Sequence, residues 1–136
     1  MYPRKVPAWK ILVVDDDPDI RRVAALALER IGGFGVLLAA NAAEALALTA
    51  VEAPDLILLD VTMPDVDGPT LLAQLRARAL TERTPVVFFT ATSSDAEVER
   101  LCSLGAAAVV AKPFEIADLP RRVRDILARS GVQSPG

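Results

Sequence analysis

The sequence predicts a single α/β domain built on a doubly wound, five-stranded parallel sheet with helices on both faces. Five short apolar runs of strand character each precede a segment of helical periodicity. Parallel strands need a long crossover between them, usually a helix, so this alternation builds a sheet covered by helices. The length of 136 residues is typical of one domain.

The expected strands share a short length and a high content of Val, Leu and Ile. They span residues 10–15, 34–39, 55–60, 85–90 and 107–111. We expect the folded domain to cover residues 9–130, preceded by an N-terminal arm at 1–8 and followed by a polar C-terminal tail at 131–136.

The first helix has clear signals at both ends. Asp17 is the predicted N-cap and Pro18 the first helical residue, because proline is tolerated where no backbone N–H bond is needed. Gly32-Gly33 ends the helix. The apolar positions between these signals are Ile20, Val23, Ala24, Ala27 and Ile31.

The second and third helices are predicted from shorter patterns. Asn41 is the expected N-cap of the second helix, in which Leu46 and Val51 would face inward. The third helix follows Gly68-Pro69. Its apolar positions are Leu71, Leu72 and Leu75.

The fourth helix begins after Ser94, which has capping-box spacing to a glutamate, and ends at Gly105. We expect Cys102 in this helix to be a core thiol. The fifth helix carries its apolar residues at helical spacing, at Leu119, Val123, Ile126 and Leu127. Pro120 fits this helix only if Asp118 is the N-cap, because the proline then lies in the first turn.

The composition excludes several classes of function. The chain has no histidine, which removes Ser-His-Asp and Cys-His catalysis and histidine proton shuttles. A single cysteine excludes an intrachain disulfide and any multi-cysteine metal site. The net charge of −3, without a dense basic run, argues against direct nucleic-acid binding. No apolar run approaches the roughly 20 residues of a membrane span, and no signal peptide is visible. We therefore expect a cytoplasmic protein with a protein partner.

Polar residues follow four of the five expected strands. Asp15 and Asp16 end the first strand, Asp60 the third and Thr90 the fourth, while Lys112 follows the fifth. Ligands of doubly wound sheets bind beyond the carboxyl ends of the strands, so these side chains are expected to converge on one crevice.

Three carboxylates in one crevice repel one another unless a cation lies between them. Oxygen ligands of this kind favour Mg²⁺, which accepts one or two carboxylates together with phosphate oxygens. Asp60 is a candidate nucleophile because carboxylates form acyl phosphates. The ammonium of Lys112 and the hydroxyl of Thr90 would neutralise a transferred phosphoryl group.

With these residues in place, the chain resembles the receiver domain of bacterial two-component response regulators, of the chemotaxis-regulator type. The motifs ILVVDDDP, LILLDVTMPDVDG, VVFFTAT and AKPF stand in the order and spacing of that family. The resemblance implies a flavodoxin-like (βα)5 fold with strand order 2-1-3-4-5. It also implies a phosphoacceptor switch whose phosphoryl donor is a sensor histidine kinase or a histidine phosphotransfer protein. Such a domain is not an enzyme, because it catalyses only its own phosphorylation and dephosphorylation.

The resemblance assigns a role to each polar residue. Asp60 would be the phosphoacceptor, Thr90 and Lys112 would contact the phosphoryl group, and the Lys112-Pro113 bond would be cis. The Mg²⁺ ligands would be Asp15, Asp16, Asp60 and the backbone carbonyl of Thr62.

Signalling in the family passes through the face formed by the fourth helix, fifth strand and fifth helix. The resemblance also implies that a homodimer could form through this face. Val109 stands where the family has a switch aromatic on the fifth strand, so that part of the switch is expected to work differently here. The downstream protein target is not identified by the sequence.

Two other functions remain as alternatives. VVDDDPDI is superficially similar to the opening motif of haloacid-dehalogenase-like phosphatases, with Asp15 as nucleophile and Asp17 as acid/base. Against this, Pro18 stands where that motif prefers glycine, and the chain lacks room for a cap domain.

The second alternative is an interaction module that acts without phosphorylation. A nucleotide-binding protein is disfavoured because the first strand–helix turn has no glycine-rich loop. The chain would act alone, as a phosphorelay intermediate, or as part of a longer protein.

Overall fold

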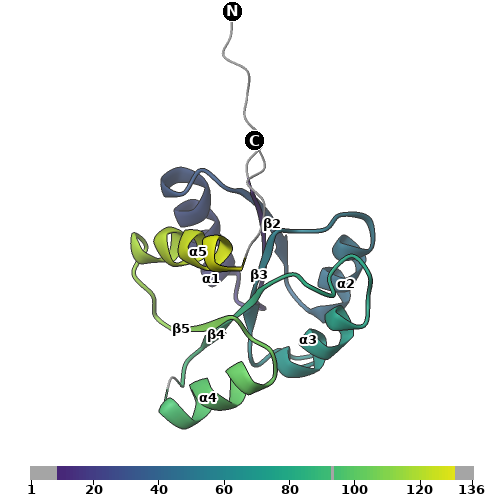
Figure 1. The fold of residues 1–136 in the computed structure, drawn as a ribbon. Coiled ribbons are helices and arrows are strands. Elements are labelled where there is room, and N and C mark those ends of the chain that lie inside the picture. Colours follow the sequence, from purple (N-terminus) through teal and green to yellow (C-terminus); the bar gives the residue numbers. More distant parts are fainter. Residues whose placement is uncertain (1–8, 93, 131–136) are drawn as a thin grey trace, which may run out of the picture.

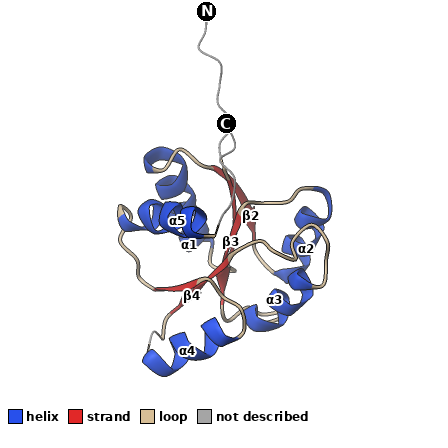
Figure 2. Ribbon diagram, in the orientation of Figure 1, coloured by secondary structure: helices blue, strands red, loops and turns tan. Residues whose placement is uncertain are grey.

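The computed structural model describes residues 9–92 and 94–130, so the predicted arm at 1–8 and tail at 131–136 lie outside the described residues. Five parallel strands form one sheet in the order β2-β1-β3-β4-β5, which confirms the predicted flavodoxin-like fold (Figures 1 and 2). The strands are β1 (Lys10–Val14), β2 (Gly35–Ala39), β3 (Leu56–Asp60), β4 (Val86–Thr90) and β5 (Ala108–Ala111).

Helices cover both faces of the sheet, which appears as the central layer in Figure 1. One face packs against α1 (Pro18–Leu26), its π-helical extension η1 (Ala27–Ile31) and α5 (Asp118–Arg129). The other face packs against α2 (Ala42–Val51), α3 (Gly68–Arg76) and α4 (Asp95–Ser103). None of the helices in the described part of the chain is long and apolar enough to cross a membrane.

The two faces share one set of strands because successive strand side chains point to opposite sides. In β3, Leu58 packs against the face of α1 and α5, whereas Leu59 packs against the face of α2, α3 and α4. Both side chains are fully buried. A sheet buried on both faces needs apolar residues at consecutive positions, which explains the unbroken run LILL before Asp60.

The predicted starts of three helices are confirmed. Asp17 accepts a hydrogen bond from the backbone N–H of the second residue of α1, and Asn41 accepts one from the N–H of the third residue of α2. Ser94 accepts from the N–H of Glu97 at the start of α4. The N-cap of α3 is Asp67, which the sequence interpretation did not identify. Each cap satisfies an N–H that the helix leaves without an internal partner.

The prediction that Val51 faces inward is wrong, since 85% of this residue is exposed. The buried face of α2 consists of small side chains at helical spacing, namely Ala42, Ala45 and Thr49. Val51 lies two residues beyond Thr49, on the opposite side of the helix. Leu46 is partly buried against the same core.

Ile31 was also expected on the apolar face of the first helix, but this residue is 55% exposed. The N–H of Gly32 bonds to the carbonyl of Ala27, five residues earlier, which is the spacing of a π turn. This wider turn shifts the buried positions of η1 to Ala27 and Leu28.

Two predictions on the last helices are corrected as well. Cys102 is exposed and is not a core thiol, because the neighbouring Leu101 occupies the inward position of α4. Asp118 is the first residue of α5 and not its N-cap, which is Ala117. The Asp118 carboxylate pairs instead with Arg121, one turn along the helix. Pro120 still lies in the first turn, where the missing N–H has no cost.

Candidate functional site

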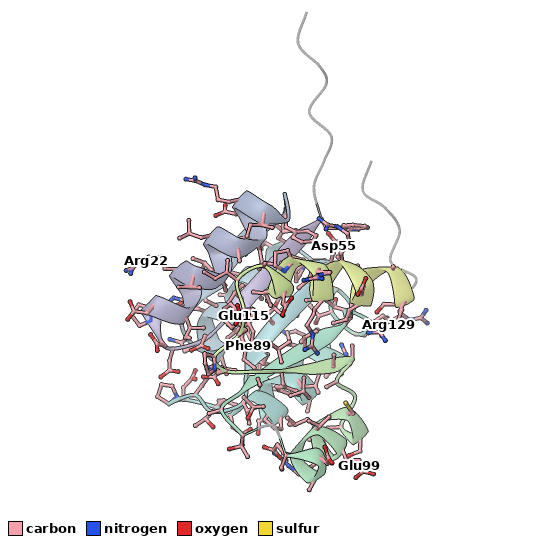
Figure 3. All side chains as sticks on the ribbon, turned by 90° about the vertical axis from the view of Figure 1, so that its left-hand side faces the viewer. Arg22, Asp55, Phe89, Glu99, Glu115 and Arg129 are labelled. Atoms are coloured by element: carbon pink, nitrogen blue, oxygen red, sulfur yellow. The ribbon has the colours of Figure 1, made fainter. Side chains whose placement is uncertain are left out.

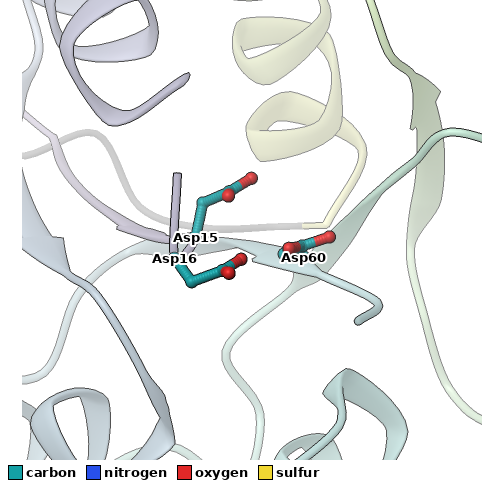
Figure 4. Close-up of side chains that lie close together, drawn as sticks. All are labelled: Asp15, Asp16 and Asp60. Atoms are coloured by element: carbon teal, nitrogen blue, oxygen red, sulfur yellow. The ribbon is translucent and has the colours of Figure 1, made fainter. Parts of the chain in front are cut away.

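Three carboxylates meet at the carboxyl end of the sheet. Asp15 and Asp16 follow β1, and Asp60 is the last residue of the neighbouring strand β3. One carboxylate oxygen of each lies within 4.8 Å of the others. Figure 4 shows the three side chains directed into the same space. This convergence follows from strand order, since β1 and β3 are adjacent and end at the same edge.

Asp15 is fully buried, and its backbone and carboxylate groups contact several neighbouring residues. Its backbone N–H donates to the carbonyl of Ala39, and its carboxylate Oδ1 accepts from the N–H of Asp17 at 2.9 Å. Its own carbonyl accepts from the guanidinium of Arg21 at 2.7 Å. The Nζ of Lys112 lies 2.7 Å from its Oδ2. The orientation of the carboxylate is therefore fixed by backbone and side-chain partners together.

Asp60 is 7% exposed and also faces Lys112, whose Nζ lies 3.2 Å from Oδ1. The same oxygen accepts a longer hydrogen bond, 3.4 Å, from the N–H of Thr62. Burial raises the pKa of Asp60, the charge of Asp15 raises it further, and Lys112 only partly offsets both effects. Asp60 is thus a carboxylate whose ionised form is poorly compensated by the protein alone.

Lys112 carries the only ammonium that contacts these carboxylates in the described part of the chain. Burial acts to lower its pKa, but the hydrogen bond to Asp15 and the charges of Asp15 and Asp60 outweigh burial, so the pKa is raised. One positive charge therefore faces two buried carboxylates, with the exposed Asp16 close by. This excess of negative charge and the all-oxygen donor set fit a hard divalent cation such as Mg²⁺.

Thr90 is the last residue of β4, the strand beside β3, and its hydroxyl bonds within its own loop. Its hydroxyl donates to the carbonyl of Thr92 at 2.9 Å and accepts from the N–H of the same residue at 3.0 Å. The side chain is nearly buried. To reach a group bound to Asp60, the hydroxyl would have to leave these two partners.

The segment that carries Lys112 is anchored on both sides. The backbone N–H of Lys112 donates to the carbonyl of Thr90, and the Lys112-Pro113 bond is cis as expected. The ring of Phe114 stacks on that of Phe89, with centroids 5.3 Å apart. These contacts set the position from which Lys112 reaches the carboxylates.

Asp65 is a residue whose role the sequence interpretation missed. It lies in the loop between β3 and α3, yet its carboxylate accepts from the backbone N–H groups of Ala42 and Ala43 in the first turn of α2, both at 3.2 Å. It also accepts from the N–H of Val66 at 2.8 Å. Although desolvation opposes them, these donors hold the pKa of Asp65 below its usual range. The loop that follows Asp60 is therefore tied to the neighbouring helix.

Gly68 is the first residue of α3, whereas the sequence interpretation had the helix follow Gly68-Pro69. Its N–H donates to the carbonyl of Val61 at 2.8 Å, which closes the loop after Asp60. A Cβ at this position would lie 2.5 Å from the carbonyl oxygen of Asp60 and 2.8 Å from the ring of Phe88. Only glycine fits without displacing the end of β3, but a glycine at the start of a helix gives no signal of such a contact.

Comparison with known proteins gives consistent matches. A family model described as the response regulator receiver domain matches residues 11–124. The chain is similar to response regulator Rre1 of Synechocystis sp., with 39% identity over 124 residues, or 91% of this chain and 54% of that protein. It is similar to the alkaline phosphatase synthesis transcriptional regulatory protein PhoP of Bacillus subtilis, with 38% identity over 126 residues, or 93% and 51% of the two chains.

Solved structures agree in fold. The chemotaxis response regulator CheY4 of Vibrio cholerae superposes with a TM-score of 0.82 at 28% identity, covering 88% of this chain and 98% of that one. The receiver domain of the Francisella response regulator 1452 gives a TM-score of 0.80 at 32% identity, covering 89% and 98%. The chain covers nearly the whole length of these two solved structures. By contrast, it spans about half the length of the curated relatives it matches.

Proposed function

We propose, since the chain belongs to the response regulator receiver domain family, that it is a two-component phosphorylation switch with Asp60 as the phosphoacceptor. The observation that carries the proposal is the convergence of the Asp60 carboxylate with Asp15, Asp16 and Lys112 at the carboxyl end of the sheet. The donor would be a phosphohistidine on a sensor histidine kinase or a histidine phosphotransfer protein.

In the proposed reaction, a carboxylate oxygen of Asp60 attacks the phosphorus atom. The P–N bond to the donor imidazole breaks as the P–O bond forms, so an acyl phosphate replaces a phosphohistidine. An ionised carboxylate has no proton to lose and needs no general base, which agrees with a chain that lacks histidine. Lys112, which pairs with Asp60, would neutralise a phosphoryl oxygen.

Asp15, Asp16, Asp60 and the backbone carbonyl of Thr62 would hold Mg²⁺ in this site. When bound, Mg²⁺ would neutralise the negative charge of the carboxylates and of the incoming phosphoryl oxygens. Asp17 would not serve as a ligand, because its carboxylate is the N-cap of α1. That same bond, with Pro18 beginning the helix, argues against the phosphatase alternative, in which Asp17 would be the acid/base.

Signal output would begin at Thr90. A phosphoryl group on Asp60 would compete for the hydroxyl that now bonds to Thr92, and so would alter the loop that leads into α4. Val109 replaces the expected aromatic on β5 and is partly buried against the core. We therefore expect a smaller or different change of the face formed by α4, β5 and α5, read by a protein target or by a second copy of the chain.

The proposal is tested by incubating the protein with acetyl phosphate, with and without Mg²⁺, and measuring intact mass. Wild type should gain one phosphoryl group only with Mg²⁺, and Asp60→Asn should gain none. Asp19→Asn, which removes an exposed aspartate of α1, is the matched control and should label like wild type. Labelling of Asp60→Asn at the wild-type level, or an unmodified wild type, would overturn the assignment and favour the phosphorylation-independent module.

A further inference from the structure

Arg21 of α1 contacts the site without belonging to it. Its guanidinium Nη1 donates to the backbone carbonyl of Asp15 at 2.7 Å, in a partly buried position. Asp15 follows the last residue of β1, where the strand ladder ends. The carbonyl would otherwise lose the partner that a buried backbone group needs.

The contact links α1 to the turn that presents two of the three carboxylates. Asp15 and Asp16 are consecutive, so the peptide plane between them contains the carbonyl that Arg21 holds. Rotation of that plane would move both side chains relative to Asp60. A hydrogen bond from a charged donor is shorter and stronger than a neutral one, so it resists this rotation.

We propose that Arg21 is a positioning residue for the divalent-cation site, acting through the Asp15 carbonyl to fix the spacing of the carboxylates. This inference rests on the proposed function, because it concerns the same cation. Arg21 is not proposed to contact the cation or the phosphoryl group.

A simple charge effect predicts the opposite result, which makes the inference testable. A positive charge near a cation site repels the cation, so removing any nearby arginine should tighten Mg²⁺ binding. If Arg21 positions the carboxylates, removing its donors should weaken Mg²⁺ binding despite the lost repulsion. The sign of the change separates the two roles.

Arg22 is the matched control on the same helix. Its side chain is 69% exposed and, among the described residues, pairs only with Asp19, at 3.2 Å. Figure 3 shows it projecting outward from α1. Substituting Arg22 changes the net charge by the same amount as substituting Arg21 and leaves the carbonyl of Asp15 untouched.

The experiment is calorimetric titration of the unphosphorylated protein with Mg²⁺ at fixed ionic strength, for wild type, Arg21→Met, Arg21→Lys and Arg22→Met. Methionine keeps the aliphatic stem and removes the donors. We expect Arg21→Met to raise the Kd about tenfold, the lower end of the effect typical of residues that orient metal ligands. Arg22→Met should leave the Kd unchanged or lower it, and Arg21→Lys should recover part of the loss because it keeps a charged donor.

A second readout does not depend on cation affinity. The N–H of Asp17 bonds to the carboxylate of Asp15, so its hydrogen exchange should accelerate in Arg21→Met and not in Arg22→Met. Circular dichroism establishes whether each variant is folded at the temperature of the titration. If Arg21→Met is unfolded at that temperature, Arg21→Lys is compared with wild type and Arg22→Met instead. A higher Kd is then expected only for Arg21→Lys.

The outcomes separate the inference from the proposed function. Wild type that neither binds Mg²⁺ nor accepts a phosphoryl group refutes both. Wild type that does both, together with an Arg21→Met Kd equal to or below that of Arg22→Met, refutes only the role of Arg21.

Discussion

At the residue scale, the site combines carboxylates that the fold buries with too little positive charge to balance them. Asp15 and Asp60 are buried by the strands that carry them, and Lys112 is shared between the two. Burying an ionised group is costly unless it is paired, so this arrangement lowers the stability of the ion-free protein. Binding of a cation to the native state would recover that loss, because a ligand that binds only the folded form stabilises it.

The raised pKa of Asp60 predicts that the free energy of unfolding depends on pH. The usual value of 3.8 holds in the unfolded chain, while the folded pKa is higher, so the free energy of unfolding falls as pH rises from 3.8 through the folded pKa. Without Mg²⁺, Asp60→Asn should therefore be more stable than wild type at pH 7. The difference should shrink as the pH is lowered toward 3.8.

Urea unfolding at several pH values measures this difference, with Asp19→Asn as the exposed control. A less stable Asp60→Asn at pH 7 would mean that the ion pair with Lys112 outweighs the burial of Asp60.

At the scale of the elements, the loop between β3 and α3 is tied to its surroundings at two points. Asp65 bonds to the first turn of α2, and Gly68 packs against the end of β3. Thr62, whose carbonyl we propose as a cation ligand, lies between Asp60 and these anchors. Loops that carry ligands must be held by rigid elements to keep their geometry.

Gly68→Ala should destabilise the protein, because the added methyl group meets the carbonyl of Asp60 and the ring of Phe88. Overpacking of this kind costs about 1–3 kcal/mol. Gly35→Ala is the control, since the nearest atom to its Cβ lies 3.8 Å away, in ordinary contact. Chemical denaturation of both variants measures the costs, and equal costs would argue against the close packing at Gly68.

Asp65→Ala should loosen the contact between the loop and α2. We expect faster hydrogen exchange at the amides of Ala42, Ala43 and Val66, which lose their acceptor. Asp95→Ala, which removes an exposed carboxylate in the first turn of α4, is the control and should leave those amides unchanged. Unaltered exchange in Asp65→Ala would mean that the loop is held by other contacts.

At the scale of the whole molecule, one sheet joins two apolar cores into a single unit. Neighbouring residues of β3 pack into different cores. Unfolding of either core would therefore also disrupt β3 and, with it, the other core. Small domains of this kind usually unfold in one cooperative transition.

Leu58→Ala and Leu59→Ala test that unity, because each creates a cavity in a different core. Each should lower the free energy of unfolding by about 2–5 kcal/mol. Val51→Ala, at a site that is 85% exposed, should change it by less than about 0.5 kcal/mol. Circular dichroism and Trp9 fluorescence should give the same midpoint for each variant. Separate midpoints in either leucine variant would indicate that the two cores unfold independently.

The sequence by itself determined the alternation of strands and helices, the caps at Asp17, Asn41 and Ser94, and the polar residues at the strand ends. These features depend on local periodicity and on bonds between residues a few positions apart. Local patterns were less reliable where a helix deviates from regular geometry, as in η1, or buries small residues, as in α2.

Only the tertiary structure decided which individual atoms of these groups contact one another. The sharing of Lys112 between two carboxylates, the bond from Arg21 to the Asp15 carbonyl, and the reach of Asp65 to α2 each join different elements. Such contacts depend on strand order, register and side-chain direction, which residue spacing does not encode. Periodicity reports which side of an element is buried, whereas contact between elements is set by how their buried sides pack together.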